Sequence, residues 1–167
     1  MKKCISVVLV LSMLLLSACN GGPAKQITVA EAGYTCDAFV EYGENFSSNV
    51  LVKAIGGGMF SLTVKTPEDI AGLTFSFDNS EMSIQYNGIE SETVIPNEYG
   101  GFADVLNEIF LKFTTSKPDV PYKDGAYLLE GSNSEYSFLL TFNEKGFPLS
   151  LLVKEKNLNV TFSNWTY

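Results

Sequence analysis

The chain has no histidine, and all 11 of its basic residues are lysines. Without histidine there can be no Ser-His-Asp or Cys-His catalytic group, no imidazole metal site and no histidine pH switch. Without arginine, no guanidinium fork can hold a phosphate or a carboxylate through two parallel hydrogen bonds. We therefore expect a protein that is not an enzyme and that binds no cofactor and no metal ion.

Positive charge is also scarce, because 19 acidic residues outnumber the 11 lysines and give a net charge of -8. Such a chain is repelled by nucleic acids and by anionic lipid surfaces. Apolar residues still make up 46% of the sequence, which is enough for a packed core and excludes general disorder. A length of 167 residues fits one domain, and we expect a monomer that binds no nucleic acid.

Only one long hydrophobic run is present, and it lies at the amino terminus. A lysine pair precedes an almost unbroken apolar stretch over residues 5–16. This stretch is shorter than the roughly 20 apolar residues of a transmembrane span and has the layout of a secretory signal. The sequence Leu-Ser-Ala-Cys at 16–19 resembles a bacterial lipobox, in which Cys19 becomes the first residue of the mature protein and carries the lipid. The alternative is an ordinary signal peptide cut near Ala18.

Lipidation of Cys19 divides the chain into a signal peptide at 1–18, a lipidated cysteine with a flexible tether at 19–33, and a single domain at 34–167. Buried acyl chains contribute about 0.8 kcal/mol per methylene, so several chains would hold the domain at a membrane. We expect an extracytoplasmic protein anchored to the cell membrane or to an outer membrane. Cys36 then has no cysteine partner, and we predict a small buried apolar residue rather than a reactive thiol.

Alternation of apolar and polar residues, closed each time by turn residues, predicts about nine strands. They are expected at 34–42, 49–55, 59–65, 73–77, 82–87, 125–130, 135–142, 148–154 and 158–165. The exception is 102–117, where apolar residues recur at the spacing of an amphipathic helix. We therefore predict an α+β fold, in which a strongly curved antiparallel sheet, a half-barrel, has the central helix covering its concave face.

Several segments of the domain have a pattern known from one family. They are DGAYLLEG at 124–131, YSFLLTF at 136–142, GFPLSL at 146–151, VTFSN at 160–164, and VKTP at 64–67 followed by GLTF at 72–75. In hydrophobic spacing and turn residues they resemble the LolA/LolB-like lipoprotein-carrier superfamily. The resemblance implies a half-barrel around an apolar cavity that holds the lipid chains of other lipoproteins. A lipid of its own would make this chain similar to the anchored acceptor type, although it lacks arginine and a long amino-terminal helix.

The candidate site is a set of ten apolar residues on the predicted strands and helix. They are Phe60, Leu62, Phe75, Phe77, Met82, Ile84, Phe110, Phe113, Phe138 and Leu140. The set is either a filled core or the lining of a cavity that admits an acyl chain, and both have the same composition. The first case predicts a structural or protein-interaction lipoprotein of the envelope. The second predicts a membrane-anchored lipoprotein that binds a lipid, an acyl chain or an acylated protein.

Overall fold

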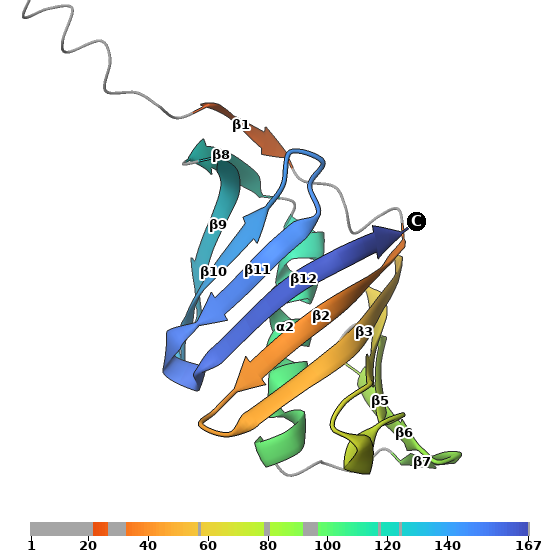
Figure 1. The fold of residues 1–167 in the computed structure, drawn as a ribbon. Coiled ribbons are helices and arrows are strands. Elements are labelled where there is room, and N and C mark those ends of the chain that lie inside the picture. The colour runs from red at the N-terminus through yellow and green to blue at the C-terminus, as the bar shows by residue number, and fades with distance from the viewer. Residues whose placement is uncertain are drawn as a thin grey trace, which may run out of the picture.

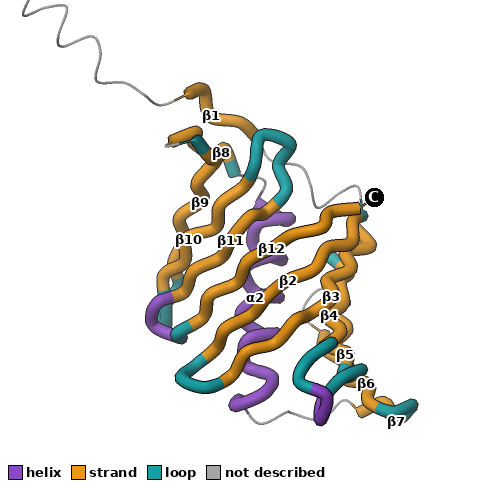
Figure 2. The backbone as a smooth tube through the Cα atoms, viewed as in Figure 1, coloured by secondary structure: helices purple, strands orange, loops and turns teal. Residues whose placement is uncertain are grey.

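The described chain is mostly β-structure, arranged as one open antiparallel sheet that curves around a long helix (Figure 1). The computed structural model describes residues 22–26, 33–56, 58–78, 81–91, 97–116, 118–123 and 125–166. Helix α2 spans Asn97–Ser116, and two short 3-10 turns are η2 (Glu68–Ile70) and η3 (Lys154–Lys156). Figure 2 shows the long helix lying against the strands, with the loops at their ends.

Twelve strands make up the sheet of the described chain, in the order β1-β8-β9-β10-β11-β12-β2-β3-β4-β5-β6-β7. Their bounds are β1 (Gly22–Gln26), β2 (Tyr34–Tyr42), β3 (Phe46–Gly56), β4 (Met59–Val64), β5 (Thr74–Asp78), β6 (Glu81–Tyr86), β7 (Ile89–Ser91), β8 (Asp119–Lys123), β9 (Ala126–Ser132), β10 (Ser137–Phe142), β11 (Pro148–Val153) and β12 (Leu158–Thr166). All neighbouring strands pair antiparallel. The large antiparallel sheet with one long helix agrees with the expected fold class.

The expected number of about nine strands is too low. Each of the nine expected strands is present, and β1, β7 and β8 are additional. These three are short and lie at or next to the two edges of the sheet. β1 and β7 are short and have no alternating apolar pattern, whereas β8 alternates, with Val120 fully buried, but contains a proline that argues against a strand. The Pro121 of β8 lies where the pairing with β1 shifts register, a position where a strand tolerates proline.

The expected tether at 19–33 also differs from the structure. Its residues 22–26 form β1, which pairs with β8 through Gly22 opposite Tyr122 and Gln26 opposite Asp119. Glycine, proline and polar residues suggested a segment without secondary structure. The strand forms because the edge of β8 offers backbone groups that β1 can pair with.

Helix α2 begins five residues before the expected start at Phe102 and includes Gly100 and Gly101. Close packing shows why residue 101 is a glycine. A Cβ atom built on Gly101 would lie 2.5 Å from the hydroxyl oxygen of Tyr42 on β2. Glycine costs a helix interior about 1 kcal/mol relative to alanine, but at this position it allows close contact between helix and sheet.

Side chains alternate between the two faces of the sheet as expected. We call the face covered by α2 the inner face and the opposite one the outer face. On β2, Cys36, Ala38 and Val40 are buried on the inner face, whereas Phe39 between them is 43% exposed. Val40 lies opposite Val160 of β12, and both are fully buried. The inner positions therefore join into one continuous apolar layer.

Candidate functional site

The first half of α2 packs directly on the inner face through Phe102, which has no exposed surface. Its ring lies 5.5 Å from that of Phe46 on β3 and 5.8 Å from that of Phe75 on β5, measured between centroids. The ring of Tyr42 on β2 lies 6.4 Å away. One helical side chain thus contacts three strands, so there is no gap between helix and sheet at this point.

The middle of the helix makes a second contact of the same kind through Phe110. Its ring centroid lies 6.0 Å from that of Phe60 on β4 and 6.0 Å from that of Phe162 on β12. β4 and β12 are separated by β3 and β2 in the sheet. A single side chain reaches both because the sheet curves around the helix, as Figure 1 shows.

Most of the ten candidate residues lie together in this helix-sheet core. The buried ones are Phe60, Leu62, Phe75, Phe77, Ile84, Phe110, Phe138 and Leu140. Met82 is only partly buried and packs against the same cluster. Phe113 belongs to α2, but its side chain lies outside the described residues, and so does Cys19.

A small hollow remains beside Phe110, where α2 faces the β3-β4 hairpin. Its volume is about 30 Å³, and its lining is Tyr34, Val52, Ala54, Gly56, Gly58, Met59, Phe60, Phe110 and Leu111. Pockets that hold small-molecule ligands usually have volumes of about 300–1,000 Å³. This hollow has room for little more than a water molecule. Among the described residues, the space between helix and sheet is therefore filled with side chains.

Cys36 lies in the core on β2 and is a free, buried cysteine. Burial, reinforced by the neighbouring Asp37 carboxylate, raises the pKa of the Cys36 thiol to about 12. The thiol therefore stays protonated at neutral pH, and a protonated thiol is a poor nucleophile. The structure agrees with the expected role of Cys36 as a small apolar residue.

A polar contact fastens the second half of α2 to the turn between β9 and β10. The Glu108 carboxylate accepts hydrogen bonds from the Tyr136 hydroxyl and, at 2.8 Å, from Asn133 Nδ2. Lys112 Nζ, one helical turn further on, donates to the Ser132 carbonyl at 3.1 Å. The hydrogen bond from Tyr136 is the main cause that lowers the pKa of Glu108, while burial raises the pKa of Tyr136. These partners lie 25 and 28 residues further along the chain, so no local sequence pattern indicates them.

The lowered pKa of Glu108 predicts a loss of stability in acid. Its carboxylate stabilises the folded state above the ordinary pKa of 4.5, and this contribution is lost as the pH falls through the lower folded-state pKa. We expect Glu108→Gln to flatten the decrease in unfolding free energy below about pH 4.5, measured by urea denaturation at a series of pH values.

Asp104 on the same helix provides a control, because its pKa is shifted in the opposite direction. Burial raises its pKa, so acidification favours the folded state through this group. Asp104→Asn should therefore steepen the loss of stability in acid. If Glu108→Gln left the pH profile unchanged or steepened it, as Asp104→Asn should, the contact between Glu108 and the β9-β10 turn would not form in solution.

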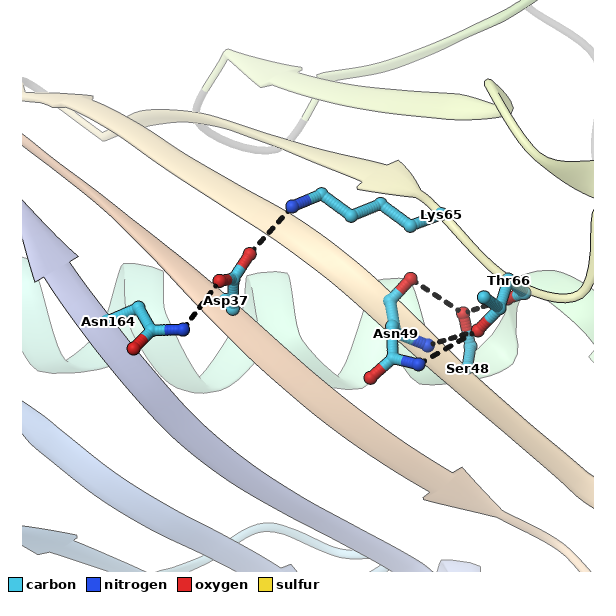
Figure 3. Close-up of polar contacts among 6 residues, drawn as sticks. All are labelled: Asp37, Ser48, Asn49, Lys65, Thr66 and Asn164. Carbon is cyan, nitrogen blue, oxygen red and sulfur yellow. Dashed lines mark hydrogen bonds and ion pairs between the residues drawn. The ribbon is translucent and has the colours of Figure 1, made fainter.

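The outer face carries a polar network in place of a dry surface (Figure 3). Asp37 on β2 accepts hydrogen bonds from Lys65 Nζ at 2.7 Å and from Asn164 Nδ2 at 2.9 Å. The Lys65 contact comes first among the causes that lower the pKa of Asp37. On β3, Ser48 lies in the buried row with Val50, and its hydroxyl donates to the Thr66 carbonyl oxygen at 2.7 Å. These contacts join β12, β2 and β3 to the segment that follows β4.

Two open grooves lie on the outer side of the sheet. The larger, of about 770 Å³, crosses β3 to β6, and we call it the serine groove. It is lined by Lys53, Ile55, Met59, Phe60, Ser61, Ser76, Phe77, Asp78, Glu81, Met82 and Ser83. Ser61, Ser76 and Ser83 stand opposite one another on three adjacent strands and form its floor. Ile55 and Met59 are 59% and 40% exposed at its side.

The smaller groove, of about 520 Å³, crosses β9 to β11 and includes Leu139, Leu152 and Lys154. Sequence analysis singled out neither groove, because alternating polar residues on an outer face are the ordinary pattern of a half-exposed sheet. Within the described ranges, no three His, Cys, Asp or Glu side chains are grouped as metal ligands. No helix of the described chain is both long and apolar enough to cross a membrane.

Comparisons with known proteins find similarity at the level of structure only. No family model and no curated protein sequence matches the chain. An uncharacterized conserved protein from Thermus thermophilus is 10% identical over 84% of this chain and 82% of its own, with a TM-score of 0.49. The LolA superfamily protein NE2245 from Nitrosomonas europaea is 7% identical over 80% of this chain and 84% of its own, with a TM-score of 0.36.

A LolA superfamily protein is thus among the solved structures that this chain is similar to. At these identities and TM-scores, neither structure identifies a ligand or an activity for this chain.

Proposed function

We propose that this chain is a lipid-anchored lipoprotein of the bacterial envelope that acts by binding another protein through its outer face. The observation that carries the proposal is the filled inner face. Phe102 and Phe110 occupy the concave side of the sheet, and the space left beside them is about 30 Å³. A carrier of acyl chains needs an enclosed apolar cavity of several hundred Å³.

The outer face supports a binding role because it has an open groove lined by polar, apolar and charged side chains. The serine groove offers hydroxyl groups along its floor, the exposed apolar side chains of Ile55 and Met59, and charges from Lys53 and Glu81. Interfaces between proteins contain an apolar centre with a polar rim. The exposed side chains of Ile55 and Met59, at the side of the serine groove, are the best candidates for that centre.

The sheet offers a matched pair of positions for a crosslinking experiment. A photo-crosslinking amino acid at Ile55 lies in the serine groove, and one at Leu149 is also exposed but lies on β11, outside the residues that line either groove. We expect illuminated cells to give an adduct of defined mass with an envelope protein from position 55 and none from position 149. Equal adducts from both positions would indicate non-specific contact and contradict a role for the groove.

A second candidate function, binding of an apolar ligand, is favoured by the lining of the hollow, which is almost entirely apolar. An acyl chain would fit only if the end of α2 moved away from the β3-β4 hairpin. This candidate is tested separately by titration of the purified protein with a fluorescent fatty acid. Saturable binding that survives high salt and is lost in Ala54→Phe, which fills the hollow, but kept in Leu149→Phe, would favour the ligand over the protein partner.

A further inference from the structure

The lipid anchor and the sheet are closer together than a tether of fifteen residues would place them. β1 begins at Gly22, which is three residues after Cys19. Successive Cα atoms are 3.80 Å apart, so the Cα atoms of Cys19 and Gly22 are separated by at most about 11 Å in any conformation. β1 is the terminal strand of the sheet. If Cys19 carries acyl chains, as the proposed function requires, this edge of the sheet must lie next to the lipid headgroups.

The residues beside Gly22 have side chains of the kind that favour a membrane interface. Gly22 lies opposite Tyr122 of β8, and Tyr122 lies opposite Tyr127 of β9, with 5.0 Å between the ring centroids. Lys25 Nζ lies 6.0 Å from the centre of the Tyr127 ring, and the Lys123 side chain is exposed. Tyrosine rings and the long stems of lysine are suited to the headgroup layer, where one end of the side chain is apolar and the other is wet.

The position of β1 is secured by a contact with the body of the sheet. Lys25 Nζ donates a hydrogen bond to the carbonyl oxygen of Glu144, at 3.0 Å, in the loop between β10 and β11. β1 is therefore attached both to β8 and to this loop. A lipid attached three residues before β1 constrains the orientation of the whole sheet.

The distribution of charge favours the same orientation. The strands β5, β6 and β7 carry Asp78, Glu81 and Glu90 and no lysine. They form the opposite edge of the sheet, as Figure 1 shows. An anionic membrane surface repels this acidic edge. The edge formed by β1 and β8 carries Lys25 and Lys123 against one acidic residue, Asp119, and is repelled less.

We propose that the protein stands on the membrane by the edge formed by β1 and β8, with Tyr122, Lys123 and Tyr127 at the lipid headgroups, and holds the acidic edge formed by β5, β6 and β7 away from it. The proposal rests on the lipid anchor of the proposed function. It adds a lipid-contacting surface and a defined orientation, in which the serine groove on β3 to β6 lies towards the far edge and is accessible to a partner.

The chain has a single tryptophan, so the orientation can be tested by fluorescence quenching. In a Trp165→Phe background, Tyr122→Trp places the probe at the proposed contact, and Ile89→Trp places it on β7, where Ile89 is 73% exposed. The full-length precursor is expressed in a host that processes lipoproteins, and the purified product is reconstituted into vesicles of phosphatidylcholine and anionic phosphatidylglycerol. Part of the phosphatidylcholine carries a nitroxide on the choline headgroup. We expect the probe at 122 to lose most of its fluorescence and the probe at 89 to lose none.

Lys123→Trp, at an exposed position, repeats the measurement if the Tyr122 variant does not fold, as judged by circular dichroism. Equal quenching at both edges, or stronger quenching at 89, in protein that floats with the vesicles would overturn the orientation and leave the anchor intact. Protein that does not float with the vesicles would overturn the anchor, and the orientation with it. The two failures are thereby distinguished.

Discussion

Phe102→Ala is expected to lower the free energy of unfolding by about 3–5 kcal/mol, the usual cost of removing a buried phenylalanine ring. Phe102 has no exposed surface and contacts three strands through Tyr42, Phe46 and Phe75. The variant would leave a cavity at the place where α2 meets the sheet. Because single domains are stable by only about 5–15 kcal/mol, this is a large fraction of the total. Urea denaturation measures the difference.

Phe39→Ala is the matched control, because Phe39 is also a phenylalanine of the sheet region but is 43% exposed on the outer face of β2. We expect it to change the unfolding free energy far less than Phe102→Ala. A similar loss from the two variants would mean that α2 is not packed on the inner face in solution. The interior would then have room for a ligand, and the proposal of a filled core would fail.

Cys19→Ala is expected to remove the protein from the membrane fraction of the cells that express it. Acylation of one cysteine with several chains supplies the whole membrane affinity in this proposal, since each buried methylene contributes about 0.8 kcal/mol. Fractionation of the cells and mass spectrometry of the purified protein measure the effect together. The wild-type protein should lack residues 1–18 and carry the mass of the lipid.

Cys4→Ala provides the control, because Cys4 lies within the signal segment that is removed. It should leave both the membrane fraction and the mature mass unchanged. A Cys19→Ala chain could stay on the membrane because its signal is not cleaved. Its mass would then include residues 1–18, which distinguishes it from the processed protein. A Cys19→Ala protein that stays in the membrane fraction with the mass of the processed wild type would show that Cys19 does not carry the anchor.

Local sequence patterns were enough to predict the long elements of this fold. Alternating residues such as Phe60, Leu62 and Val64 predicted strands with one dry face, and the structure buries all three. The spacing from Phe102 to Phe110 predicted the helix and the side of it that packs. These patterns are local, because the side chains of strands and helices repeat every 2 and 3.6 residues. A short stretch of sequence is therefore enough to show them. The predictions of a signal segment and of a lipidated Cys19 rest on local patterns of the same kind and lie outside the described residues.

Other features depend on contacts between residues far apart in the chain. β1 pairs with the edge of β8 almost a hundred residues later, and Tyr42 leaves no room for a Cβ atom at residue 101 of α2. The hydrogen bond between Glu108 and Tyr136 also joins two separate segments.

The choice between a filled core and a cavity also depends on contacts between residues far apart in the chain. Phe60, Phe110 and Phe162 would have the same composition and periodicity around a ligand as they have around one another. Only the distances between their rings, set by the curvature of the sheet and the approach of the helix, showed that the space is occupied. Volume is a property of the assembled chain, and no local pattern encodes it.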